Sequence, residues 1–460
     1  MDKDITGNII CNVSNGKLIC GNGEKIITDI SIDTRTLNVG DMYIAIKGEK
    51  NNGNKYVEQA LENGAMACIV DEMPDKRILA KYKDRTIIKV DNSLKALQDL
   101  ARYKRSLYNI PVVAVTGSVG KTSTKDIIAS VLSEEYNVLK TEGNFNNHIG
   151  LPLTLLKLKD HTAVVVEMGM NHFGEISTLT NIAKPTVAVI TNIGTSHIGN
   201  LGSRENILKA KLEILEGLSK DGTVIINNDN DLLNNWAKSV DNYNVISYGI
   251  ENKSNFNAKN IKEEEQETNY EINIEGQEYN VKVPVVGKHF VYNSLCAISV
   301  GKALKMGNNK IINGISKFKL TAKRMDFIKI KNNVTVLADY YNASYDSVKS
   351  ALEVVQKYDA NRKIAVLGDM LELGEFAKPL HEKVGIEVNK NNIDVLITVG
   401  ELAKNIAKKA QEFGTKEVYE CNNNKEAIEI LNKIIKEKDL VLLKASNAMN
   451  FGEILGGINE

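Results

Sequence analysis

The chain has 460 residues, of which 43% are hydrophobic, and this length suits about three globular domains. Lysine plus arginine and aspartate plus glutamate number 58 each, so the net charge is zero. A neutral chain gives no electrostatic reason to expect nucleic acid or an anionic membrane as a partner. Any anionic ligand must therefore be held by local features of the fold.

The cysteines and the start of the chain indicate the compartment. The five cysteines form no Cys-x-x-Cys pair and are odd in number, which favours reduced thiols over a disulfide framework. The N-terminal residues lack the basic and apolar regions of a signal peptide, and no stretch is long and apolar enough to span a membrane. We therefore expect a cytoplasmic protein.

Residues 1–108 are predicted to form a small α/β domain. Residues 41–48 and 65–70 are typical of strands, and residues 56–63 of a helix. Residues 93–108 carry leucines at helical spacing, and Ser93 is expected to cap this helix.

Residues 109–322 are predicted to form a central domain with a parallel sheet covered by helices on both faces. The predicted strands alternate with helical segments, which is typical of this architecture. Residues 250–283 alternate between charged and apolar and are expected to add antiparallel strands at the edge, followed by a turn at 285–289 and a helix over 293–305. The main strands are predicted at residues 112–115, 163–167, 187–192 and 223–227.

Residues 323–460 repeat the α/β alternation and are predicted to form a doubly wound, Rossmann-like domain. An open sheet of this kind binds ligands at the carboxyl ends of its strands. Two polar segments, 339–346 and 367–375, follow predicted strands at that edge, although Ser344 or Asp346 is also a candidate helix cap. The predicted strands are 334–338, 363–367, 395–399 and 441–443.

The strongest motif lies at the start of the central domain, where a β-branched strand runs into Thr-Gly-Ser-Val-Gly-Lys-Thr. Gly117 and Gly120 allow a tight turn, and the following helix presents free N–H groups. Lys121 would reach terminal phosphates and the Thr122 hydroxyl a Mg²⁺ ion. The loop is shorter than the general pattern, so a glycine turn with a chance Lys-Thr is the alternative.

Other candidate residues follow the next strands. Glu167 ends a buried strand and suits a Mg²⁺ ligand, although a surface carboxylate is the alternative. His197 is either a metal ligand or a polar loop residue. Lys209 and Lys211 interrupt an apolar helical pattern, which by itself favours solvated lysines. Residues 142–154 form a polar loop that is either a turn cluster or a binding segment for a polar substrate.

Taken together, these segments resemble the Mur ligases, which add amino acids to the peptidoglycan precursor. The likeness covers nearly the whole chain and includes Thr116–Thr122, the segments 144–156 and 367–374, and the order of Glu167, His197 and Lys211. Residues 144–156 are similar to the branch that adds D-alanyl-D-alanine. The chain departs from the family pattern at Tyr345 and Asn447.

The resemblance implies a function and a set of site residues. It implies a UDP-binding first domain, a P-loop ATPase-type second domain, and an amide ligase that uses ATP and Mg²⁺ to join D-alanyl-D-alanine to UDP-N-acetylmuramoyl-tripeptide through an acyl phosphate. A monomer is expected. The implied catalytic residues are Lys121, Lys211 and His197; ATP would bind Gly117, Ser118, Val119, Gly120, Lys121, Thr122, Ser123, Asn293, Arg324 and Asp339; substrate would bind Ser31, Thr34, Arg35, Lys47, Gly48, Asn144, Asn146 and Asn147; and the metal would bind Thr122, Glu167, His197 and Lys211, the last as a CO₂-derived carbamate.

Three other functions fit part of the pattern. Another amino-acid ligase of the same superfamily is one, and residues 144–156 argue against it. A non-catalytic nucleotide-binding regulator is the second, and the intact Lys121, Thr122 and Glu167 argue against that. An ATPase coupled to motion is the third, and it would turn over without an amine acceptor.

Overall fold

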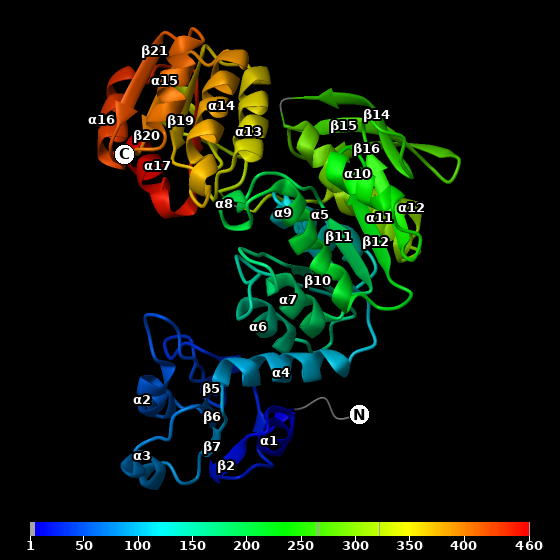
Figure 1. Ribbon diagram of the computed structural model, residues 1–460, viewed down its shortest axis with the longest axis vertical. Helices are drawn as coiled ribbons and strands as arrows, with labels where there is room; N and C mark the ends of the chain where they lie inside the picture. Colours follow the sequence, from blue (N-terminus) through cyan, green and yellow to red (C-terminus); the bar gives the residue numbers. More distant parts are fainter. Residues whose placement is uncertain (1–4, 265, 322, 460) are drawn as a thin grey trace.

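The computed structural model describes residues 5–264, 266–321 and 323–459, which fold into three α/β domains along the chain (Figure 1). Their main sheets have five, nine and six strands in these ranges, and most neighbouring strands are parallel. The predicted three-domain α/β fold class is therefore confirmed. Within the same ranges, no helix has both the length and the apolar character that crossing a membrane requires.

The N-terminal domain has a sheet in the order β2-β7-β6-β5-β4, in which β4 to β7 run parallel. The prediction that Ser93 caps the long helix is wrong: the Asn92 side chain accepts from the N–H of Lys95, because Asn92 has the extended backbone of a cap residue. The elements are β1 Ile5–Thr6, α1 Gly7–Ser14, β2 Lys17–Cys20, β3 Ile26–Ile27, β4 Ile30–Ser31, β5 Met42–Ile44, η1 Gly53–Tyr56, α2 Val57–Glu62, β6 Ala67–Val70, α3 Lys76–Lys81, β7 Thr86–Lys89 and α4 Ser93–Ser106.

The central domain has a nine-stranded sheet in the order β16-β15-β14-β13-β12-β11-β8-β10-β9. At the β16 edge of this sheet, β15 runs antiparallel to both of its neighbours, β14 and β16, which agrees with the antiparallel edge predicted for residues 250–283. The elements are β8 Val112–Thr116, α5 Lys121–Leu132, β9 Val138–Lys140, α6 Gly150–Leu156, β10 Ala163–Glu167, α7 Glu175–Ala183, β11 Val187–Ile190, α8 Ile198–Leu201, α9 Arg204–Leu212, η2 Glu213–Gly217, β12 Thr223–Asn227, α10 Asp231–Lys238, β13 Asn244–Gly249, β14 Phe256–Glu263, β15 Thr268–Ile274, β16 Gln277–Val283, α11 Lys288–Ala303 and α12 Asn308–Ser316.

Helix α11 begins five residues before the predicted start at 293. Gly287 has a φ of 127° and ends the preceding loop, so the chain enters the helix at Lys288. His289 therefore lies on the helix rather than in a turn.

The C-terminal domain has a six-stranded sheet in the order β17-β18-β22-β19-β20-β21, with only β17 antiparallel. The four predicted strands are present, and β17 and β21 were missed. The elements are β17 Asp326–Lys329, η3 Lys331–Asn333, β18 Thr335–Ala338, α13 Tyr345–Lys357, β19 Arg362–Gly368, η4 Gly374–Phe376, α14 Ala377–Lys390, β20 Val395–Val399, α15 Lys404–Glu412, β21 Glu417–Cys421, α16 Asn424–Ile434, β22 Asp439–Lys444, η5 Asn447–Met449 and α17 Gly452–Asn459.

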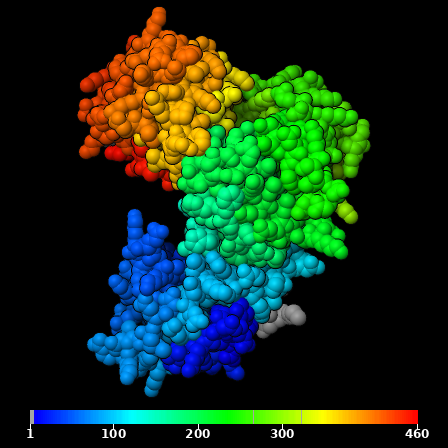
Figure 2. Space-filling view, viewed as in Figure 1, coloured from blue at the N-terminus to red at the C-terminus, as the bar shows by residue number. Residues whose placement is uncertain are grey.

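The first and second domains are joined through the end of α4. The buried guanidinium of Arg105 donates to the carbonyls of Ala183 (2.9 Å) and Lys184 (3.3 Å) at the end of α7, and to that of Tyr108 (2.6 Å). A cation at a helix C-terminus is favourable because the last carbonyls lack helical partners. Figure 2 shows an open hollow between the N-terminal and C-terminal domains, closed on one side by the central domain.

Replacing Gly314 by alanine should destabilise the central domain, because a Cβ there would lie 2.4 Å from the Cα of Val131 on α5. Backbone atoms cannot rotate away, so we expect a loss of about 1–3 kcal/mol. Gly456→Ala in α17 is the matched control, since no atom lies within 4 Å of its Cβ position. Urea unfolding followed by circular dichroism tests this, and an unchanged midpoint for Gly314→Ala would contradict it.

Candidate active site

The loop between β8 and α5 requires glycine at two of its positions. Gly117 has a φ of 151°, and a Cβ there would lie 1.9 Å from the hydroxyl oxygen of Thr191. Gly120 has a φ of 81° and immediately precedes the first residue of α5. Both positions therefore need glycine, one for space and conformation and the other for its left-handed backbone.

The end of β11 holds this loop in place. The backbone carbonyl of Asn192 accepts from the N–H of Ser118 (3.0 Å), and its side-chain oxygen accepts from that of Val119 (3.0 Å). The carbonyl of Val119 accepts from Thr191 Oγ1 (2.8 Å) and from Asn192 Nδ2 (3.0 Å). Sequence reasoning missed Asn192, although a polar residue directly after a buried strand was a usable signal.

Lys121 folds back over the loop that precedes it. Its ammonium donates to the carbonyls of Gly117 (2.8 Å) and Ser118 (3.3 Å). Desolvation lowers the pKa of Lys121, the nearby Glu167 carboxylate opposes this, and the Arg324 guanidinium adds to it. The lysine thus supplies a positive charge directly over a loop shaped to hold phosphate.

Glu167 ends β10 and is only 2% exposed. One carboxylate oxygen accepts from Thr122 Oγ1 (2.8 Å), and the other accepts from Asn146 Nδ2 (2.7 Å). Arg324 donates to the same Thr122 hydroxyl (3.1 Å) and lies 4.0 Å from the ring centre of Tyr341. The predicted pair Thr122 and Glu167 is therefore brought together, and Asn146 joins it.

The donor set at this point fits a magnesium ion that is mostly held by phosphate and water. Thr122 and Glu167 offer two hard oxygens beside the phosphate loop. In nucleotide sites Mg²⁺ often takes only one or two ligands from the protein and the rest from phosphate and water. Among the described residues, no three His, Cys, Asp or Glu side chains are grouped to hold a metal by themselves.

Lys211 on α9 is 1% exposed, whereas Lys209 points to solvent. The solvated alternative is therefore wrong for Lys211 and holds for Lys209. Burial, together with the charge of Lys121, lowers the pKa of Lys211 well below its ordinary value. Within the described ranges, the Lys211 ammonium has no hydrogen bond or ion pair.

His197 has a left-handed backbone with a φ of 64° and precedes α8. Its Nδ1 lies 2.8 Å from Oε2 of Glu372 in the C-terminal domain, with angles that fall short of a hydrogen bond. Glu372 lies in the segment 367–375, which was predicted to bind ligands at the carboxyl edge of the C-terminal sheet. This segment therefore contacts the central domain at His197.

A cavity of about 630 Å³ unites most of the predicted residues and lies between the central and C-terminal domains. The C-terminal side is contributed by Tyr341, Val354, Lys357 and Lys444 among others. The predicted residues that line it are Ser118, Val119, Gly120, Lys121, Thr122, Ser123, Asn146, Asn147, Glu167, His197, Asn293, Arg324 and Asp339.

Some residues that line the cavity also form hydrogen bonds or ion pairs with other protein groups. Asp339 pairs with the buried Lys444 at 2.6 Å, and Asn293 accepts from the Thr124 hydroxyl (3.0 Å), which ties α11 to α5. Asn147 accepts from the N–H groups of Ile149 and Gly150 at the start of α6. The exposed Asn144 does not line the cavity.

The C-terminal domain contacts the loop that carries His197. Asp346 accepts from the N–H (2.9 Å) and the hydroxyl (3.0 Å) of Thr195, while Ser344 and not Asp346 caps α13. On the far side of the cavity, Lys357 pairs with Glu263 at 2.8 Å. These contacts could not be predicted from the sequence because they join residues from different domains.

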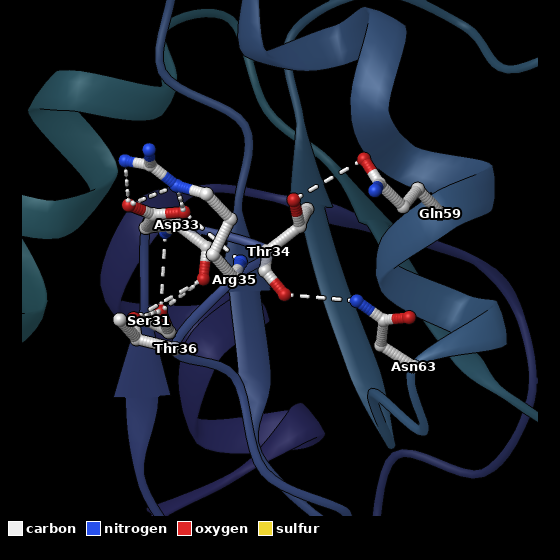
Figure 3. Close-up of polar contacts among 7 residues, drawn as sticks. All are labelled: Ser31, Asp33, Thr34, Arg35, Thr36, Gln59 and Asn63. Atoms are coloured by element: carbon white, nitrogen blue, oxygen red, sulfur yellow. Dashed lines mark hydrogen bonds and ion pairs between the residues drawn. The ribbon is translucent and has the colours of Figure 1, made fainter.

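The candidate residues of the first domain lie at the edge of another sheet and do not line this cavity. Figure 3 shows Ser31 at the end of β4 and Thr34 and Arg35 in the turn that follows, where the Thr34 hydroxyl already donates to Gln59. Lys47 pairs with Glu72 at 3.2 Å, and the N–H of Gly48 donates to the carbonyl of Asn51 (2.8 Å).

Comparisons with known proteins match this architecture along the chain. Residues 26–105 match the model of the Mur ligase family catalytic domain, residues 115–301 the Mur ligase middle domain, and residues 323–447 the Mur ligase glutamate ligase domain.

Named relatives and solved structures of the same family are similar to this chain over nearly its full length. The UDP-N-acetylmuramoyl-tripeptide–D-alanyl-D-alanine ligase of Bacillus subtilis (strain 168) is 37% identical over 440 residues, covering 95% of this chain and 94% of the relative. MurF from Acinetobacter baumannii superposes with a TM-score of 0.90 at 27% identity over 99% of this chain and 98% of that one. MurF ligase from Thermotoga maritima, solved in complex with ADP, superposes with a TM-score of 0.82 at 28% identity. The match covers 94% of this chain and 97% of that one. The chain belongs to the Mur ligase family.

Proposed function

We propose that this protein joins D-alanyl-D-alanine to UDP-N-acetylmuramoyl-tripeptide and converts ATP to ADP and phosphate. The observation that carries the proposal is the single cavity in which the phosphate loop, the Thr122–Glu167 pair and the 142–149 loop meet the C-terminal domain. Relatives that carry the name of this activity match the chain over nearly its full length.

In the first step, an oxygen of the tripeptide carboxylate attacks the γ-phosphorus of ATP, ADP leaves, and an acyl phosphate forms. The loop residues Gly117–Ser123 hold the phosphates, and Lys121 offsets their charge, which is the main requirement of phosphoryl transfer. Thr122, Glu167 and His197 would hold Mg²⁺, which neutralises phosphate oxygens when bound. Asn293, Arg324 and Asp339 would complete the ATP site.

In the second step, the free amine of D-alanyl-D-alanine attacks the acyl carbon. A tetrahedral intermediate forms, the amine loses its proton, phosphate leaves, and an amide bond remains. Asn144, Asn146 and Asn147 offer amide groups for the peptide substrate. The docked C-terminal domain covers the cavity, which protects an acyl phosphate from water.

The UDP group would bind the first domain, across the hollow seen in Figure 2. Ser31, Thr34, Arg35, Lys47 and Gly48 are the proposed contacts, and all lie at or near the carboxyl edge of the N-terminal sheet. We keep the predicted domains 1–108, 109–322 and 323–460 and a monomeric enzyme as parts of this proposal.

We further propose that Lys211 carries a carbamate. A buried ammonium without a counter-ion among the described residues is costly, and its lowered pKa favours the neutral amine. The amine nitrogen would bond to the carbon of CO₂ and release a proton, which replaces a cation with hard anionic oxygens. Such oxygens suit the magnesium site better than an ammonium does.

The requirement for both substrates tests the function. Phosphate release from ATP should need UDP-N-acetylmuramoyl-tripeptide and D-alanyl-D-alanine together, because an acyl phosphate without its amine acceptor is a dead end. A coupled phosphate assay, with each substrate omitted in turn, measures this. Full turnover without D-alanyl-D-alanine would instead support an uncoupled ATPase.

Lys121→Ala should lower kcat/KM at least about a hundredfold, the scale of losing a major electrostatic contact in phosphoryl transfer. The fold should persist, since the lysine ammonium bonds only to carbonyls of its own loop. Lys209→Ala, on an exposed face, is the control and should be near wild type. Activity of Lys121→Ala within a few-fold of wild type would remove this loop from the mechanism.

Lys211→Ala should lose nearly all ligase activity, with partial rescue by a short carboxylate in the buffer that replaces the missing carbamate oxygens. Lys209→Ala should stay active, because residues two apart on a helix face different directions. A ¹³C NMR signal after exposure to labelled bicarbonate should be present in wild type and absent in Lys211→Ala. An unmodified Lys211 in a nucleotide- and magnesium-bound crystal structure would refute the carbamate.

A further inference from the structure

Helix α8 and the loop before it lie against the C-terminal domain (Figure 1). A Cβ on Gly199 would lie 2.6 Å from the backbone nitrogen of Gly374 and 2.7 Å from the carbonyl oxygen of Glu372, so two backbones meet directly here. A glycine at 199 leaves the room that this close approach needs. His197, two residues earlier, is therefore brought next to the segment that carries Glu372.

The Nδ1 atom of His197 faces this segment. It lies 2.8 Å from Oε2 of Glu372, the distance of a charge-assisted hydrogen bond, but the angles are not those of a formed bond. Nδ1 is buried and has no hydrogen-bond partner within the part of the chain that the structure describes. A buried polar atom without a hydrogen bond is uncommon and calls for an explanation.

The second nitrogen of the ring supplies that explanation. His197 lines the cavity together with Thr122 and Glu167, the pair proposed to hold Mg²⁺. A histidine that binds a metal through Nε2 carries its proton on Nδ1 and normally donates it to a carboxylate or a carbonyl, which fixes the direction of the ring. Glu372 is a carboxylate at the right distance, and it comes from the other domain.

Both partners have an unusual backbone. His197 and Glu372 each have a φ of 64°, in the left-handed region that residues other than glycine rarely adopt. Such conformations persist where the surrounding structure imposes them, and they gather at functional sites. The two side chains therefore meet because each backbone is held in place by its own domain.

The C-terminal domain fixes the chain just before Glu372. The N–H of Met370 donates to Nε2 of the buried His381 (3.0 Å), a residue of α14. The N–H of Leu371 donates to the hydroxyl of Ser446 (2.9 Å), which follows β22. The position of the Glu372 backbone is thus set by two buried side chains of the C-terminal domain.

The same domain also holds the other end of the loop that carries His197. Asp346 accepts from the N–H (2.9 Å) and the hydroxyl (3.0 Å) of Thr195. The contacts at Thr195 and at Gly199 lie on either side of His197 in the sequence. The docked C-terminal domain therefore sets the position of this loop as well as supplying a carboxylate to it.

We propose that Glu372 is a positioning residue of the magnesium site, whose carboxylate accepts the Nδ1 proton of His197 and leaves Nε2 for the metal. The ligand set of the central domain is then complete only while the C-terminal domain is docked. The inference rests on the proposed function, because it takes Mg²⁺ beside Thr122 and Glu167 as given. An ion pair that merely holds the two domains together is the alternative.

The chain contains two matched controls. Lys357 and Glu263 form another ion pair between the same two domains (2.8 Å), on the far side of the cavity. Glu263→Gln therefore weakens docking without touching His197. Glu375 is an exposed carboxylate three residues after Glu372, so Glu375→Gln removes a nearby charge without removing the contact.

Manganese binding to the full chain, measured by electron paramagnetic resonance with saturating ADP, tests the inference. Glu372→Ala should weaken Mn²⁺ binding about tenfold, the scale of losing a carboxylate behind a metal-bound histidine. Glu372→Gln should lose less, because its amide oxygen still accepts from Nδ1. Glu263→Gln and Glu375→Gln should match wild type. In a His197→Ala background, Glu372→Ala should add nothing.

A spectroscopic signal and kinetics separate positioning from damage to the fold. The spin-echo modulation of a histidine nitrogen bound to Mn²⁺ should be present in wild type, absent in His197→Ala and weakened in Glu372→Ala. Glu372→Ala should also raise the Mg²⁺ concentration needed for half-maximal rate, with the rate at saturating Mg²⁺ within a few-fold of wild type.

Three results would overturn the inference: unchanged Mn²⁺ affinity in Glu372→Ala, an equal loss of affinity in Glu263→Gln, or no histidine nitrogen signal in wild type. The second result would assign the contact to docking alone. If Mn²⁺ binds as described but phosphate release does not need both substrates, the proposed function fails while this inference stands.

Discussion

The site depends on how the end of β11 holds the glycine loop. Thr191 and Asn192 bond to the backbone of Ser118 and Val119, and Thr191 leaves no room for a side chain at Gly117. Since β11 is the direct neighbour of β8 in the sheet, strand order itself shapes the loop. The N–H groups that face a phosphate are thus set by the folded sheet before any ligand binds, and this preorganisation lowers the cost of binding.

The C-terminal domain completes the cavity with aromatic and charged side chains. Tyr341 lies against Arg324, and the Lys444–Asp339 pair supports the same wall. Asp346 and Lys357 fasten the domain on two sides of the cavity, to Thr195 and to Glu263. These two contacts are polar, and polar contacts are typical of domains that separate and close during a reaction cycle.

Sequence patterns predicted the buried strands well and the edges poorly. The runs at β8, β10 and β20 are apolar on both faces, so their bounds were read almost to the residue. The edge strands β17 and β21 were missed because half-exposed strands carry polar residues. The motif from Gly117 to Thr122 indicated the phosphate site, but the burial of Lys211 depends on neighbours brought by tertiary packing.

Helix α5 links the phosphate site to the connection between the second and third domains. Its first turn carries Thr122, which accepts from Arg324, and one turn later Asp126 accepts from the Thr321 hydroxyl (2.5 Å). The residues on both sides of the connection are therefore anchored to one face of one helix, because positions four apart lie above each other. Both ends of the connection between the second and third domains are thus tied to the helix that begins at the phosphate loop.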